Sequence, residues 1–353
     1  MRVIVTRPSC WGSKFKSNTL DIRYVPIGFP DRRLRKGEPA ADNMGEVMTG
    51  EGEKLLIKAF AEHKPRVFLF WPHFGNFTPK LLKRLKKSNP KTVFVHGNGN
   101  HVLGPHSVCW YIHKYRRFID AVLTSTTDGP RKALIAKWCK WVGTLYTFGF
   151  DPDLFTAPEK DPDYDVFFGG GDSVRPRRVN GRFKYSRFRH DLVMEIAKHR
   201  KILIRGGGTW KHHGVPFKPG VMDSLPYFRE IQRAKIVLGT YHDNLERRYS
   251  KRTVYGGASG RLFMTRYIPK MEEDFKNHEN IVWFRSVDEG LELIDHYMSH
   301  DDEREKVAAR TRAHFVANHD WAARLRDFER VVPVMMRALA SGAGKGKGAG
   351  CKR

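Results

Sequence analysis

Cysteine is scarce in this chain of 353 residues, with only four cysteines, all far apart in the sequence. None of them forms a CxxC pair, so neither a zinc site nor a disulfide framework is expected. Long apolar runs are missing too, since no stretch approaches the roughly 20 residues that cross a bilayer. The first residues read as a β-strand and lack the cleavage pattern of a secretion signal. We therefore expect a cytoplasmic protein with no membrane partner, in the host cytoplasm if the protein is viral.

Acidic residues are few as well. The chain has 38 Asp and Glu against 64 Lys and Arg, which gives a formal net charge of +26. The Gly/Lys-rich end, residues 341–353, carries only four of the basic residues, so the excess belongs to the folded body. Such an excess costs self-repulsion and favours a polyanionic partner. The same charge is also explained if the proteins of the source are basic in general, or if the charge serves to keep the protein soluble.

Short apolar strands alternate with amphipathic helices in two series. This pattern predicts an α/β protein with two doubly wound, Rossmann-like domains, each a parallel sheet with helices on both faces. Three prolines between residues 150 and 164 mark the boundary. We expect domains over residues 1–150 and 151–320, and a helix over 321–340 that packs back on the first domain and is kinked by Pro333. Residues 341–353 are expected to be a disordered basic tail.

The stretch from Tyr249 to Thr265 is the most informative motif. It begins YSKRTVYGGASG and continues with the apolar LFM, which reads as a polar helix start, a helix of small residues, a glycine break and a strand. A helix that starts with Ser250 and Arg252 is suited to hold a phosphate at its N-terminus.

The order of several motifs resembles the CgeB-like, group 1-like glycosyltransferases of GT-B fold. Those proteins have a Ser-x-Arg helix start, small residues, Gly and a strand, as from Ser250 to Met264 here. They continue with an acidic helix, an apolar strand, an Asp/Glu-Arg helix pair and a His before the last helix, matched here by residues 272–275, 281–284, 302–305 and His319. The segments 148–155 and 165–170 also resemble the family. The resemblance covers residues 118–330.

The resemblance implies a nucleotide-sugar donor, most naturally a UDP-sugar, in the second domain. Backbone N–H groups, helix N-termini and basic side chains would hold its diphosphate without a metal. The residues expected to bind the donor are Gly169, Gly170, Gly171, Arg205, Gly207, Ser250, Arg252, Tyr255 and Gly260. Tyr255 departs from the family, which usually has Glu there to bind the donor ribose. No metal site is expected, since His212-His213 has no third ligand spaced with it.

A base for the acceptor hydroxyl is expected on a loop at the carboxyl ends of the first domain's strands. His73, in Trp71 to Asn76, and His96, read as the start of the loop that runs to Asn100, fit that place and can act near neutral pH. Each is also readable as a structural or solvent-exposed histidine.

Basic clusters point to the acceptor. A glycine-punctuated loop before a helix holds basic residues with interleaved aromatics, which can embrace a phosphate backbone and stack on an extruded base. The expected nucleic-acid contacts are Arg175, Arg177, Arg178, Arg182, Lys184 and Arg187 of this loop and Lys83 and Lys87 of an earlier helix.

The sequence thus predicts a glycosyltransferase (EC 2.4), a monomer or weak dimer, that moves a sugar from a nucleotide sugar to a hydroxymethylated pyrimidine in DNA, as phage-type enzymes do. Two alternatives stay open. One is a GT-B glycosyltransferase with a protein, glycan or small-molecule acceptor. The other is a non-catalytic nucleic-acid-binding protein that keeps a glycosyltransferase fold without the activity, and Tyr255 in place of the family's Glu supports this alternative.

Overall fold

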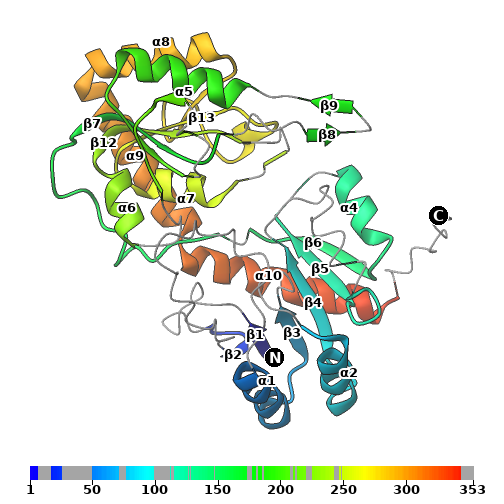
Figure 1. Cartoon of the computed structure of the whole chain (residues 1–353). Coiled ribbons are helices and arrows are strands. Elements are labelled where there is room, and N and C mark those ends of the chain that lie inside the picture. The colour runs from blue at the N-terminus through cyan, green and yellow to red at the C-terminus, as the bar shows by residue number, and fades with distance from the viewer. Residues whose placement is uncertain are drawn as a thin grey trace. The chain divides into compact units, whose positions relative to one another are not determined.

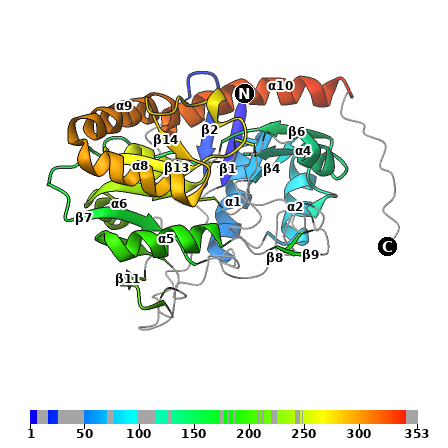
Figure 2. The same cartoon turned by 90° about the horizontal axis from the view of Figure 1, so that it is seen from above.

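The structure is a computed structural model in which the chain forms two compact units, shown in two views in Figures 1 and 2. One unit is residues 1–148 with 321–353, and the other is residues 149–320. The residues that the structure describes are 1–6, 17–25, 50–70, 77–98, 112, 115–125, 127, 129–146, 148–172, 177–179, 182–184, 187–206, 210, 213–219, 225–241, 246–247 and 249–342.

The first unit is built on a six-stranded parallel sheet. Its strand order is β2-β1-β3-β4-β5-β6. The strands are β1 (Arg2–Thr6), β2 (Asp21–Tyr24), β3 (Val67–Phe70), β4 (Val93–Asn98), β5 (Ala121–Thr124) and β6 (Trp141–Thr144). The helices described here are α1 (Gly50–His63), α2 (Pro79–Ser88), α4 (Gly129–Ala136) and α10 (Trp321–Ala340).

Alternate strand residues of this sheet face two separate cores. Phe68 and Phe94 belong to the core that includes residues of α1, α2 and α4, whereas Leu69 and Val95 belong to the core that includes α10. This is the period-2 alternation of a sheet covered on both faces. The bent C-terminal helix α10 continues through Pro333 and buries three side chains against the second face, namely Phe328, Val332 and Met335.

The second unit holds another six-stranded parallel sheet. Its strand order is β11-β10-β7-β12-β13-β14. The strands are β7 (Tyr164–Gly169), β10 (Ile202–Arg205), β11 (Phe217–Lys218), β12 (Ala234–Gly239), β13 (Leu262–Arg266) and β14 (Val282–Phe284). Counted in chain order, this is the arrangement 3-2-1-4-5-6 of a Rossmann sheet, and the order reverses between β7 and β12.

Helices cover both faces of this sheet too. Helices α5 (Phe188–His199) and α8 (Val287–Ser299) share a core with Phe168 and Phe284. On the other face, Phe167 meets Tyr227 of α6 (Leu225–Ile231), and Phe263 lies under α7 (Lys251–Ala258) and α9 (Asp301–His319). A short 3-10 helix, η2 (Met271–Glu273), completes the described elements.

Two expectations about local structure were wrong. The basic segment after β7 was expected to be a loop, but it contains an antiparallel pair, β8 (Arg177–Val179) and β9 (Arg182–Lys184). His96 was expected to begin a loop, but β4 continues through Asn98, which pairs with Thr124 of β5. The tail expected to be disordered lies almost wholly outside the described residues. None of the described helices is long and apolar enough to span a bilayer.

Candidate functional site: the carboxyl edge of the second sheet

Strands β7 and β12 lie side by side and point the same way, and their carboxyl ends therefore lie together. Gly169, Gly170 and Gly171 end β7 and follow it, and Thr240 and Tyr241 follow β12. In an open α/β sheet, ligands bind outside the carboxyl ends of the strands where the strand order reverses. This edge is therefore the expected ligand site of the second unit.

Gly169, at the end of β7, and Gly206, after β10, stand where no side chain fits. A Cβ on Gly169 would lie 1.9 Å from the hydroxyl oxygen of Tyr227. A Cβ on Gly206, just after β10, would lie 2.2 Å from the carbonyl oxygen of Gly170. The two glycine-bearing turns thus pack backbone against backbone, which only glycine permits.

Two guanidinium groups converge on this edge. Arg252 of α7 donates from Nη1 to the carbonyl oxygen of Thr240 at 3.1 Å. Arg189, 3% exposed, donates from Nη2 to the same oxygen at 3.4 Å, from Nε to the Thr240 hydroxyl at 2.7 Å and from Nη1 to the carbonyl of Gly171 at 3.0 Å. A Cβ built on Gly170 would lie 3.4 Å from the Arg252 guanidinium carbon, so this cation lies directly beside the glycine turn.

The charge of Arg252 is poorly compensated. Within the described part of the chain no carboxylate pairs with it, and its buried Nε has no hydrogen-bond partner. Burial lowers the pKa of Arg252 from its ordinary value, while Tyr227 and Tyr241 partly oppose that shift. A cation that is removed from water without a counter-charge is a ready partner for an anion.

Arg252 lies in the first turn of helix α7, and Ser250 is the N-cap of that helix. The Ser250 backbone N–H donates to the Thr253 hydroxyl at 3.2 Å, and that hydroxyl also bonds to the Tyr241 hydroxyl at 2.8 Å. The N-terminus of a helix carries partial positive charge and unsatisfied N–H groups. Arg252 and the start of α7 therefore present positive charge from one element.

Three predicted donor residues do not join this cluster. Arg205 ends β10, but its guanidinium pairs with Glu230 and with the carbonyl of Pro219. Tyr255 packs its ring among aromatic side chains, 5.1 Å from the Phe155 centroid. Gly260 follows the opposite end of α7, where its φ of +74° favours glycine. Gly207 lies outside the described residues.

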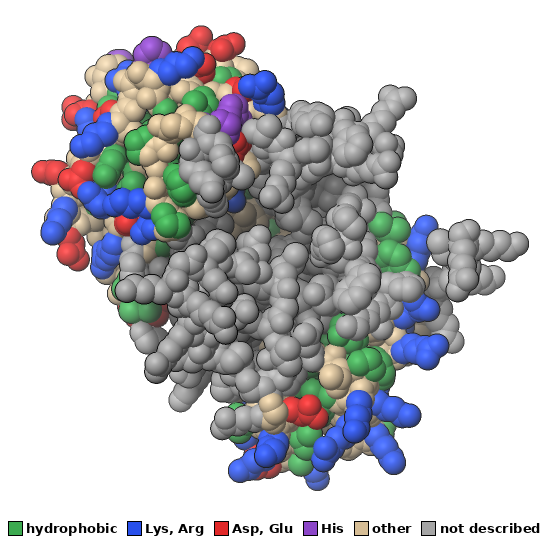
Figure 3. Space-filling view, viewed as in Figure 1, with side chains coloured by type: hydrophobic (Ala, Val, Ile, Leu, Met, Phe, Trp, Pro, Cys, Tyr) green, Lys and Arg blue, Asp and Glu red, His purple; other side chains and the backbone are tan. Residues whose placement is uncertain are grey.

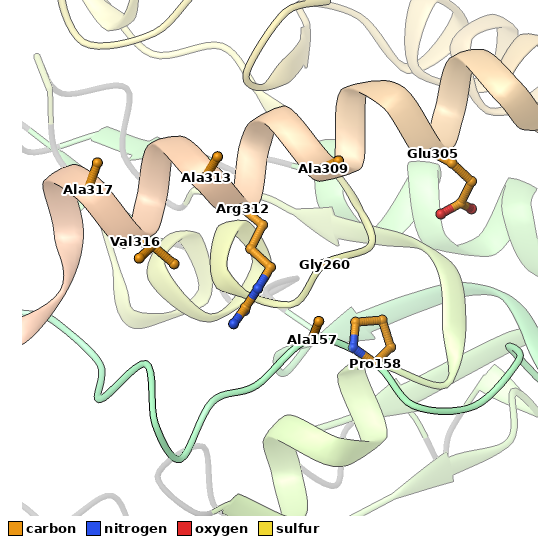
Figure 4. Close-up of a pocket in the computed structure, with 9 residues that line it drawn as sticks. All are labelled: Ala157, Pro158, Gly260, Glu305, Ala309, Arg312, Ala313, Val316 and Ala317. Carbon is orange, nitrogen blue, oxygen red and sulfur yellow. The ribbon is translucent and has the colours of Figure 1, made fainter.

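The cavity in Figure 4 is near Gly260 and not at the carboxyl edge. It has a volume of about 580 Å³ and is lined mainly by Ala and Pro with Arg312 and Glu305. Arg312 donates to the carbonyl of Ala258, the last residue of α7, so its charge is engaged with that helix end. The cavity offers no arrangement for a diphosphate.

The predicted bases lie in the first unit. His96 is wholly buried within β4, with its ring centroid 6.3 Å from that of Phe70. The role of His96 as a base for the acceptor stays a prediction. His73 lies outside the described residues, so its role stays a prediction.

The predicted nucleic-acid contacts that the structure describes lie in β8, β9 and α2 and just before α5. Arg177 and Arg178 are in β8, and Arg182 and Lys184 are in β9, with Arg177 opposite Lys184 in the register. Arg187 precedes α5 and is exposed. Lys83 and Lys87 are exposed on α2, where basic side chains gather in the space-filling view (Figure 3). Arg175 lies outside the described residues.

Sequence reasoning did not place Arg189 at this edge of the sheet and also missed a cluster of Asp172, His190 and His213 beside it. Arg189 was read as one basic residue of the loop that was expected to embrace a phosphate backbone. The useful signal is its position in the first turn of an amphipathic helix, one residue before His190, where it points back to the edge of the sheet.

Comparisons with known proteins agree with this architecture. A family model described as "Glycosyl transferase-like" matches residues 185–330. Among solved structures, HepE of Anabaena in complex with UDP-glucose is 9% identical, with a TM-score of 0.54 over 95% of this chain and 100% of that one. Sucrose-phosphate synthase of Thermosynechococcus elongatus is 10% identical, with a TM-score of 0.57 over 96% and 99%. A glycosyltransferase of Rickettsia africae is 10% identical, with a TM-score of 0.54 over 95% and 98%. No curated protein matches the sequence.

The fold and the family match agree with each other. Residues 185–330 match the glycosyl transferase-like family, and the chain has the GT-B fold, with two Rossmann-like units and a bent C-terminal helix. The chain therefore has the fold of GT-B glycosyltransferases, and its second unit resembles the glycosyl transferase-like family over the matched residues. The predicted fold class is confirmed.

Proposed function

We propose that the protein transfers a sugar from a nucleoside-diphosphate sugar, and that the second unit holds the diphosphate at the carboxyl edge between β7 and β12. The observation that supports this most is the poorly compensated guanidinium of Arg252 beside Gly170, at the N-terminus of α7. The structural relative HepE is described in complex with UDP-glucose, which makes UDP-sugars the first donors to test.

The main chemical requirement of this site is to stabilise the leaving diphosphate. When the bond between the anomeric carbon and the phosphate oxygen breaks, negative charge grows on the leaving diphosphate. Arg252 and the positive N-terminal end of α7 can stabilise that charge with groups that are already in place. The acceptor hydroxyl attacks the anomeric carbon and gives its proton to a base, for which His73 remains our candidate in the first unit.

We further propose that the acceptor is a hydroxymethylated pyrimidine in DNA. This part rests on the net charge of +26 and on the basic residues of β8 and β9. A base inside a duplex has to be flipped out before its hydroxymethyl group is reachable.

The test is incubation of the protein with a panel of nucleotide sugars and DNA that carries hydroxymethylated pyrimidines, read by the mass of the digested nucleosides. A nucleoside that gains one sugar residue, with the activity lost in Arg252→Ala, supports the whole proposal. Release of nucleoside diphosphate with no sugar on DNA would retain the donor and move the acceptor to a protein, glycan or small molecule. DNA binding with no use of any nucleotide sugar would favour a non-catalytic scaffold and overturn the proposal.

A further inference from the structure

We propose that Asp172, His190 and His213 bind one divalent transition-metal ion beside the glycine turn that follows β7. The three residues come from separate segments: Asp172 follows the glycine turn after β7, His190 lies in the first turn of α5, and His213 lies between β10 and β11. Their ligand atoms all lie within 4.8 Å of one another. The site does not depend on the proposed sugar transfer.

The carboxylate is the centre of the cluster. Oδ2 of Asp172 is 3.2 Å from Nδ1 of His190 and 2.8 Å from Nε2 of His213. Ligand atoms at about 2.0–2.2 Å from a metal ion are separated by about 2.8–3.6 Å in octahedral or tetrahedral geometry. The two separations from the carboxylate lie in that range, and all three ligand atoms lie within 4.8 Å of one another, so small shifts of the side chains can surround an ion.

The chemistry of the three ligands selects a class of ion. Two imidazoles and one carboxylate suit Zn²⁺, Fe²⁺, Co²⁺ or Mn²⁺ and suit Mg²⁺ or Ca²⁺ poorly, because the latter prefer oxygen. Three protein ligands also leave positions for water or another ligand. The Asp172 side chain is 2% exposed, whereas that of His213 is 31% exposed, so His213 forms the open side of the site.

The surroundings hold the ligands in place. The ring of Trp210 lies parallel to that of His190, with centroids 6.3 Å apart, and meets that of His213 edge-on. Trp210 is itself fully buried and donates from Nε1 to the carbonyl of Gly170 at 2.7 Å. Ligands whose orientation is fixed by packing and hydrogen bonds give a metal site its affinity.

A bound ion would hold together the three segments that lie around the glycine turn after β7. Asp172 is the neighbour of Gly171, and His190 is the neighbour of Arg189, which donates to the Gly171 carbonyl. The sequence suggested no metal because only His212-His213 was visible as a pair, and Asp172 and His190 are distant from it in the chain. The metal-independence expected of the donor site therefore needs a direct test.

The experiment uses the full chain without a histidine tag, stripped with a chelator and titrated with Co²⁺. We expect one equivalent of Co²⁺ to give a visible d–d absorption band that Zn²⁺ abolishes. Thermal unfolding with Zn²⁺ should occur a few degrees higher than without it. In His190→Ala and in His213→Ala, the affinity for Co²⁺ should fall at least about tenfold.

A matched control is His199→Ala, which removes an exposed histidine from the last turn of the same helix α5 and should leave the titration unchanged. Because removal of the buried Asp172 carboxylate risks the fold, the two histidine variants carry the test. Absence of a d–d band, or a band that persists with unchanged affinity in both His190→Ala and His213→Ala, would overturn the proposal.

Discussion

Arg252 is the single side chain on which the proposed donor site depends most. It brings a cation to the start of α7 and to the side of Gly170, and its own contact in the protein is a backbone carbonyl rather than a carboxylate. A guanidinium arranged in this way keeps most of its hydrogen-bond donors for a ligand.

Replacement of Arg252 by Ala should therefore weaken binding of a nucleoside diphosphate. A hydrogen bond between charged groups is worth about 1.5–3 kcal/mol, so we expect a loss of about tenfold to a hundredfold in affinity, measured by calorimetry. The control is Arg310→Ala, which removes an exposed arginine from α9 of the same unit and should leave the affinity unchanged. Equal affinities in the two variants would remove Arg252 from the site.

Cys139 allows a separate test at the scale of one residue. Burial raises the pKa of its thiol from 9.0 to about 12, so at pH 8 the folded protein holds roughly a thousandfold less thiolate there than an unfolded chain. Alkylation of Cys139 by iodoacetamide, followed by peptide mass spectrometry, should be far slower in the native protein than in urea. Equal rates in buffer and urea at pH 8 would contradict this burial.

Some of these residues have a local signal in the sequence, and others do not. Ser250 and Arg252 were predictable because a polar helix start followed by small residues is a local signal. Arg189 was not, because its role comes from three contacts with residues 18 and 51 positions away. Tyr255 stands where the family usually has Glu, and its ring packs among aromatic rings, which local pattern does not disclose.

At the scale of elements, α7 depends on glycine for its packing. A Cβ on Gly257 would lie 2.3 Å from the ring of Phe315 in α9, and Phe315 is fully buried. The small residues at the end of α7, Gly256 to Ala258, therefore let this helix lie close to α9.

The variant Gly257→Ala should lower the free energy of unfolding by about 1–3 kcal/mol, since the added methyl group overpacks a closed interface. The same change at Gly129, at the start of α4, meets nothing within 4 Å and should be neutral or stabilising by up to about 1 kcal/mol. Denaturant unfolding of both variants measures the difference. A Gly257→Ala protein as stable as Gly129→Ala would show that α7 and α9 are not packed as described.

The hairpin of β8 and β9 carries the prediction about DNA. Neutralising its four basic residues, Arg177, Arg178, Arg182 and Lys184, should weaken DNA binding and make its salt dependence less steep. The slope of log affinity against log salt should change by up to about 3–4, since each phosphate contact contributes about 0.9. The affinity is measured by fluorescence anisotropy at several salt concentrations.

A matched control neutralises four exposed basic residues elsewhere in the same unit, namely Lys198, Lys276, Lys306 and Arg310. It lowers the net charge equally but should leave the slope nearly unchanged. If both variants lose the same slope, the hairpin has no special part in binding. The hairpin itself was detectable, because Asn180-Gly181 between two basic strands is a strong signal for a tight turn.

At the scale of the whole molecule, the two sheets were the most predictable feature. Runs such as Val67 to Phe70 are continuous and apolar because parallel strands are buried on both faces. This pattern can be recognised in the sequence by itself. The strand order was not predictable from periodicity, although the right-handed crossovers limit the choices. The site followed from the order, because the reversal between β7 and β12 marks the edge where Arg252 and the glycine turn meet.

The central claim is that this edge binds a nucleoside diphosphate, and the most direct measurement is thermal unfolding with UDP, GDP, ADP and TDP. We predict that one of them raises the unfolding temperature of the native chain with a saturating dose dependence, and that Arg252→Ala shifts this dependence to higher concentrations while Arg310→Ala does not. If none of the four changes the unfolding temperature of the native protein at millimolar concentration, the claim is contradicted.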